Sequence, residues 1–138
     1  MAGGAWTESV LYHFGSVAND GSYPNGVIFD KAGNLYGTTL LGGDDTRYYC
    51  NTGCGTVFEL SPPATAGADW TETILHSFPS RGGDGTGPVG ALLFDKNGRL
   101  LGITESGGDS EGTAFAVVLP VACASANFNI SGDDPNET

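Results

Sequence analysis

The chain is poor in positive charge and in long apolar runs. It has 5 Lys and Arg residues against 16 Asp and Glu residues, which gives a formal net charge of −11. Phosphate backbones and anionic membrane surfaces are bound mainly through Lys and Arg, so we expect no nucleic-acid partner. No apolar run approaches the roughly 18 residues that span a bilayer, so we also expect no membrane insertion.

Residues for common enzyme chemistry are equally scarce. The two histidines, His13 and His76, occupy non-equivalent places in the repeat described below. A metal-centred hydrolase or lyase needs several ligands that converge on one channel. Nucleophile-elbow, phosphate-loop and zinc-protease motifs do not occur. We therefore expect a binding or assembly module rather than an enzyme, with a propeller hydrolase or lyase as the third alternative and no catalytic residue assigned.

Cysteine is limited to three residues. Cys50 and Cys54 flank a loop that lacks the second ligand pair of a zinc site, so we expect a local disulfide, with free thiols as the alternative. Such a disulfide persists in an oxidising compartment. Cys123 is left over, either unpaired or bridging to another chain. The start lacks the features of a signal peptide, which suggests a mature form or an added Met. The sequons at Asn129 and Asn136 matter only in a glycosylating host.

Glycine is abundant, and the sequence repeats itself. The 23 Gly residues suit many tight turns, and no stretch keeps helical apolar spacing over three turns. Residues 6–11 (WTESVL) return as residues 70–75 (WTETIL), and residues 29–39 return as residues 94–104. Each repeat divides into four short runs that are typical of strands separated by Gly, Asn and Pro turns.

The repeat predicts an all-β fold. Four antiparallel strands in a meander, with aromatic and Gly signatures at fixed places, are typical of a β-propeller blade. We expect two four-stranded blade-like repeats at about residues 6–63 and 70–120, which form one domain over 1–120. Residues 121–138 are expected to be a C-terminal strand or tail. The alternative fold is a single β-sandwich.

The same residues carry a resemblance to a known family. The pattern D-G-x-x-P…F-D-x-x-G-N-L-Y-G-T-T…G-G…C-G-T-V-F-x-L-x-P…W-T-E-x-x-L-x-x-F resembles the GloVer tandem repeat of secreted and cell-surface bacterial proteins. It covers roughly residues 6–120, and the second repeat departs from it at Leu101, Ile103 and residues 116–118. The resemblance implies an extracellular propeller-like module and assigns no activity.

The phase of the repeat predicts association between copies of the chain. Residues 27–78 hold one complete blade, which leaves a fourth-type strand at 6–14 and three strands at 91–119. Known propellers have about four to eight blades, so two blades do not close a ring. We expect a homo-oligomer in which strand 6–14 completes the 91–119 sheet of its own or a neighbouring chain. The alternatives are a fragment of a longer array and a two-sheet sandwich.

Aromatic residues suggest where a glycan would bind. Trp6 and Trp70 recur once per repeat, and ring faces stack on sugars, so a carbohydrate-binding, lectin-like module is the alternative function. Both side chains alternatively pack on the adjacent blade. Tyr48 and Tyr49 lie in the cysteine loop and form a second candidate ligand site.

Two aspartates recur before a proline. Asp20 and Asp84 suit either a Ca²⁺-binding loop or a turn in which the carboxylate caps the backbone. No acidic loop matches the spaced ladder of a calcium-binding hand, so we assign no metal and keep Ca²⁺ as an open alternative.

Overall fold

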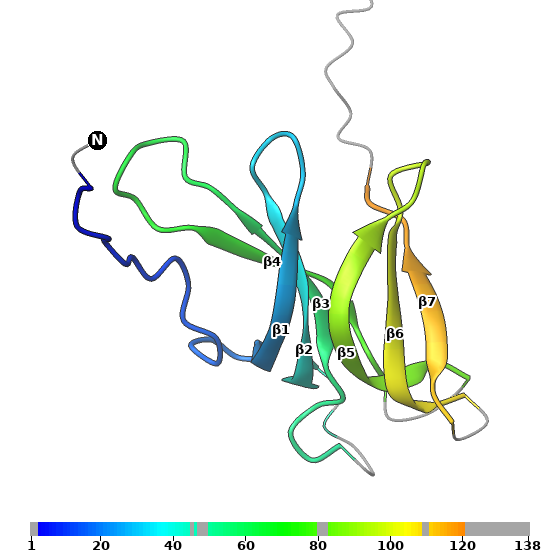
Figure 1. The fold of residues 1–138 in the computed structure, drawn as a ribbon. Coiled ribbons are helices and arrows are strands. Elements are labelled where there is room, and N and C mark those ends of the chain that lie inside the picture. Colours follow the sequence, from blue (N-terminus) through cyan, green and yellow to red (C-terminus); the bar gives the residue numbers. More distant parts are fainter. Residues whose placement is uncertain (1–2, 45, 47–49, 80–82, 109–110, 121–138) are drawn as a thin grey trace, which may run out of the picture.

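The chain folds into two antiparallel β-sheets. The computed structural model describes residues 3–44, 46, 50–79, 83–108 and 111–120. Within them the predicted all-β class is confirmed (Figure 1). The strands of the first sheet are, in spatial order, β1 (Gly21–Phe29), β2 (Leu35–Gly42), β3 (Thr56–Ser61) and β4 (Thr71–Ser77). Those of the second sheet are β5 (Gly85–Phe94), β6 (Leu100–Gly107) and β7 (Thr113–Val117). The described part of the chain contains no helix long and apolar enough to cross a membrane.

Each sheet opens with a hairpin whose turn is set by an aspartate. The Asp30 carboxylate accepts hydrogen bonds from the backbone amides of Ala32 (2.8 Å) and Asn34 (3.0 Å). Gly33 supplies the positive φ of 88° that the turn requires. Asp95 makes the equivalent pair of bonds in the second sheet. The predicted hairpin turns are therefore side-chain-capped turns.

Two predicted elements differ from those in the structure. The first strand begins at Gly21 rather than near Val27, because an irregularity between Pro24 and Val27 lets the pairing with β2 continue. The second sheet has three strands among the described residues, not four. Residues 6–14, expected to be a strand, have no strand structure in the single chain. A strand needs a neighbour for its backbone hydrogen bonds, and this segment has none.

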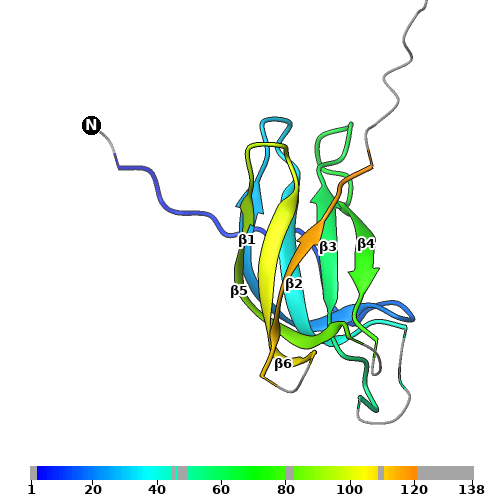
Figure 2. The same ribbon diagram turned by 90° about the vertical axis from the view of Figure 1, so that its right-hand side faces the viewer.

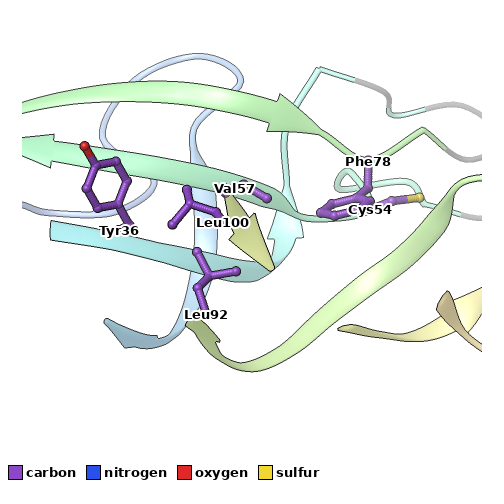
Figure 3. Close-up of a cluster of buried hydrophobic side chains, with 6 residues drawn as sticks. All are labelled: Tyr36, Cys54, Val57, Phe78, Leu92 and Leu100. Carbon is purple, nitrogen blue, oxygen red and sulfur yellow. The ribbon is translucent and has the colours of Figure 1, made fainter. Parts of the chain in front are cut away.

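The two sheets pack face to face, and the core lies between them (Figure 2). Figure 3 shows that Tyr36 and Val57 of the first sheet approach Leu92 and Leu100 of the second. The core also contains Phe78, from the segment that links the sheets. This packing is common to neighbouring blades and to sandwiches.

The repeat is reproduced in buried polar contacts. The hydroxyls of Thr39 and Thr56 lie 2.7 Å apart, and the corresponding hydroxyls of Thr104 and Thr113 lie 2.9 Å apart. Each pair sits under a glycine at the start of its sheet, and Gly85 leaves no room for a Cβ beside Thr104. The two sheets are therefore copies of one structural unit at the level of atomic contacts.

Candidate functional site

A cluster of polar side chains lies where the chain leads into β1. We call it the first junction, and it consists of Tyr12, Asp20 and Glu72. The Tyr12 hydroxyl lies 2.9 Å from a carboxylate oxygen of Asp20 and 2.9 Å from one of Glu72. The same Asp20 oxygen accepts the backbone amides of Gly15 (2.7 Å) and Ser16 (3.1 Å). Asp20 therefore caps the turn that leads into β1, as the turn-capping alternative expected.

The two carboxyl groups of the first junction lie close together and are shielded from solvent in different degrees. Asp20 is only 7% exposed, and its second oxygen and that of Glu72 are buried without a hydrogen-bond partner among the described residues. Burial, together with the contact with Asp20, raises the pKa of Glu72 to about 7. Burial also raises the pKa of Tyr12, so the phenol stays protonated. A proton held by Glu72 gives both carboxyl groups a partner.

A related cluster lies where the chain leads into β5. We call it the second junction, and it consists of His76 and Asp84. The His76 Nε2 atom lies 2.8 Å from a carboxylate oxygen of Asp84. The other oxygen of Asp84 accepts the amide of Gly85 (2.9 Å). His76 corresponds in the repeat to Tyr12, and Asp84 corresponds to Asp20. The ring nitrogen thus takes the place of the phenol.

The aromatic contacts at the two junctions also match. Phe14 lies edge-on to Phe58 of the first sheet, with ring centroids 4.9 Å apart. Phe78 lies edge-on to Phe115 of the second sheet, with centroids 5.0 Å apart. Phe14 therefore contacts the first sheet in the same way that Phe78, the residue after β4, contacts the second sheet.

Unlike β4, the N-terminal segment of residues 6–12 pairs with no strand among the described residues. It leaves the first sheet on the side opposite to β5, β6 and β7 (Figure 1). Trp6 is fully exposed (102%), and Val10 is 63% exposed. Phe14 keeps this segment away from the second sheet of its own chain.

Apolar side chains cover the outer face of the second sheet. Leu93 (67% exposed) and Ile103 (55% exposed) line a hollow there with Leu101 and Ala114. Leu93, Leu101 and Ala114 correspond to residues of the first sheet that pack against the second sheet, namely Ile28, Tyr36 and Val57. The second sheet thus exposes the face that the first sheet buries.

The face of the first sheet that points away from the second sheet exposes residues whose counterparts in the second sheet are covered. Val27 (48% exposed) and Phe29 (75% exposed) lie there. Their counterparts in the second sheet are Leu92, which is buried, and Phe94, whose ring packs on Tyr36 at 5.4 Å. Each end of the two-sheet unit therefore exposes the face of the repeat that is buried at the other end.

The structure does not bring the two tryptophans to one site. Trp70 is half-buried at a hollow lined by Leu11, His13 and Asp69, whereas Trp6 projects into solvent. Tyr48 and Tyr49 lie outside the described residues. Across the described ranges, no group of three or more His, Cys, Asp or Glu residues is placed to hold a metal ion.

Cys50 and Cys54 lie at disulfide distance, with Cα atoms 5.2 Å apart, as predicted. Cys54 is buried in the core between the sheets, so the bond fixes the loop between β2 and β3 to that core. Its environment is that of a structural crosslink. Cys123 lies outside the described residues.

Sequence reasoning missed Tyr12, Glu72 and His76. The available signal was the repeat itself, because Tyr12 and His76 stand at the same distance ahead of Asp20 and Asp84. Glu72 gave no local signal, since it meets Tyr12 only through the fold.

Comparisons with known proteins add no assignment. No family model matches the chain, and neither the curated proteins nor the solved structures contain a match.

Proposed function

We propose that this chain is an extracellular structural module, a β-propeller-like repeat unit that assembles head to tail with copies of itself. The resemblance to the GloVer repeat and the disulfide-distance cysteine pair support an extracellular setting. Self-assembly is the activity that the geometry supports best.

One observation carries the proposal. Residues 6–11 repeat the sequence of the β4 region, and Phe14 already makes the contact that Phe78 makes after β4. Yet, among the described residues, residues 6–12 pair with no strand and β7 has β6 as its one strand neighbour. Residues 6–12 have the sequence of a fourth strand, and the second sheet has three described strands. The segment of one copy could therefore pair with the edge of β7 in another.

The exposed faces support the same arrangement. Phe29 of one copy would lie over Leu101 of another, as Phe94 lies over Tyr36 within the chain. Burying these apolar faces is favourable by about 25 cal/mol per Å² of apolar surface. The contact joins unlike surfaces, so it generates a ring where the rotation closes and a filament where it does not.

The copy number follows from blade geometry. Propeller rings have about four to eight blades, so a ring of two-sheet chains contains about two to four copies. Light scattering on a sizing column measures this mass directly. We expect a discrete multimer in that range, with and without reductant.

Removal of residues 3–9 is the matched test. These residues are exposed and make no side-chain hydrogen bond within the described chain, so their loss leaves the fold intact, which circular dichroism checks. We expect the shortened chain to be monomeric. A monomeric full-length chain, or a multimer that survives the deletion, contradicts the proposal.

Carbohydrate binding is the second candidate, and the half-buried Trp70 at its hollow favours it. The measurement is Trp fluorescence during titration with soluble glycans to millimolar concentration. A saturable change that Trp70→Ala abolishes and Trp6→Ala preserves supports a sugar site at this hollow. No change in the wild-type signal rules it out for those glycans.

A further inference from the structure

Among the described residues, the second junction contains one polar group fewer than the first. The Tyr12 hydroxyl contacts two carboxylates, those of Asp20 and Glu72, both at 2.9 Å. His76 contacts Asp84 at 2.8 Å, and no described residue takes the place of Glu72. Glu72 lies on the fourth strand of its sheet, which is the strand that the second sheet lacks among the described residues.

The register of the first sheet shows which residue belongs in this place. β3 pairs with β4 so that Leu60 lies opposite Glu72 and Glu59 lies opposite Thr73. Antiparallel pairs in such a register bring facing side chains within contact distance.

The same register can be transferred to the edge of β7. Val117 and Ala116 correspond to Leu60 and Glu59, and the segment that corresponds to β4 begins at Trp6. The transferred register places Glu8 opposite Val117 and Ser9 opposite Ala116. Glu8 is the repeat counterpart of Glu72 and is exposed in the single chain.

We infer that Glu8 of a second copy docks beside His76 and Asp84, so that copies recognise one another through a carboxylate–imidazole–carboxylate contact. This deepens the proposed head-to-tail assembly and rests on it. The occupant is a second copy because the chain's own segment is held on the far side of the first sheet by the contact between Phe14 and Phe58.

The exchange of tyrosine for histidine changes the chemistry of the contact. A phenol supplies one proton and no charge, so two carboxyl groups around it must share another proton. An imidazolium supplies a positive charge and two N–H donors, so both carboxylates around it stay ionised. Docking of Glu8 therefore favours protonated His76.

Other charges near His76 act in the same direction. Asp84 bonds to it, and Asp44 lines the same hollow. Phe78 covers one edge of the ring, with centroids 4.7 Å apart. Association between copies is thus expected to be stronger when His76 is protonated.

The test is a dilution series followed by light scattering at about pH 6 and about pH 8, with EDTA present so that no metal bridge contributes. Glu8→Gln is expected to weaken association about tenfold at the lower pH, the usual loss for a hydrogen bond to a charged group. Its effect at the higher pH is smaller. Asp69→Asn removes an exposed acid that takes no part in the hydrogen bonds of either junction, so it is the control and should match the wild type.

A permanent cation in place of His76 tests the role of the proton. His76→Arg keeps the positive charge throughout, so its association is expected to differ less between the two pH values than that of the wild type. Both proteins carry Glu72→Gln in this comparison, so that the first junction does not titrate over the same range. If Glu8→Gln matches Asp69→Asn while removal of residues 3–9 still gives monomers, the inference fails and the assembly stands. If the deletion also has no effect, both fail.

A mixing experiment tests the register. Ser9→Cys and Ala116→Cys are prepared as separate proteins, each with Cys123→Ser, and combined under mild oxidation. We expect a disulfide-linked dimer in this mixture and in neither protein alone. The comparison mixture replaces Ala116→Cys with Ala114→Cys and is expected to crosslink poorly. Preferential crosslinking at Ala114, or in neither mixture, overturns the proposed pairing.

Discussion

Replacement of Glu72 by glutamine should remove a specific pH dependence of folding. In the folded chain the pKa of Glu72 is raised from 4.5 to about 7, first by burial and then by the contact with Asp20. Between these values the unfolded chain has lost the proton and the folded chain has kept it. The native state then binds more protons, so the free energy of unfolding falls as pH rises.

The magnitude follows from the shift. Each pKa unit corresponds to about 1.4 kcal/mol, which sets an upper limit of about 3 kcal/mol for the rise from 4.5 to about 7. Glu72 is only partly buried, and solvent screening reduces the expected loss to about 1–2 kcal/mol. The contribution is complete below about pH 4.5 and is lost as the pH rises through about 7.

Urea unfolding at about pH 5 and about pH 8 measures this difference. The side-chain amide that Glu72→Gln introduces donates a permanent N–H toward Asp20, as protonated Glu72 does. The variant should therefore lose about 1–2 kcal/mol less than the wild type over this range. Glu111→Gln removes an exposed acid from the turn before β7 and is the control. Equal pH dependence of the wild type and Glu72→Gln would refute the assignment of the proton to this pair.

Three further substitutions test the fold, each by urea unfolding. Tyr23 adopts a φ of 57° where the second repeat has Gly87 at 62°, so Tyr23→Gly should stabilise the chain by about 1 kcal/mol; a loss would mean that the exposed ring makes a favourable contact. A Cβ on Gly85 would strike the Thr104 hydroxyl, so Gly85→Ala should destabilise by about 1–3 kcal/mol, and a neutral result would contradict the close packing. Phe78→Ala should cost about 3–5 kcal/mol, because the ring is 1% exposed between the sheets; a cost below about 1 kcal/mol would place it outside the core.

The sequence predicted those features that depend on local chemistry. The hairpin between β1 and β2 was recognisable because Gly33 follows Asp30 at turn spacing, and the side chain and backbone of these residues form the turn without outside help. The disulfide pair was recognisable for the same reason, since Cys50 and Cys54 are separated by four positions. Repetition then extended each local signal to the second sheet.

The junctions could not be predicted because they depend on contacts that are distant in sequence. Tyr12 reaches Glu72 across 60 positions, and neither residue lies in a motif that marks it. The strand expected over residues 6–14 is absent from the single chain for a related physical reason. Its sequence favours a strand, but backbone hydrogen bonds need a neighbouring edge, and a single chain does not supply one there.

A net charge of −11 makes self-association costly, since like charges on neighbouring copies repel within the Debye length of about 10 Å. The chain has only 5 Lys and Arg residues with which to offset this repulsion. The exposed apolar faces at Leu93 and Phe29 can attract one another through the hydrophobic effect, which does not depend on charge. In the proposed assembly, protonated His76 would supply a positive charge where Glu8 of one copy meets Asp84 of another. On this proposal, free chains keep their full repulsion, whereas docking would be linked to uptake of a proton that offsets the charge of the two carboxylates.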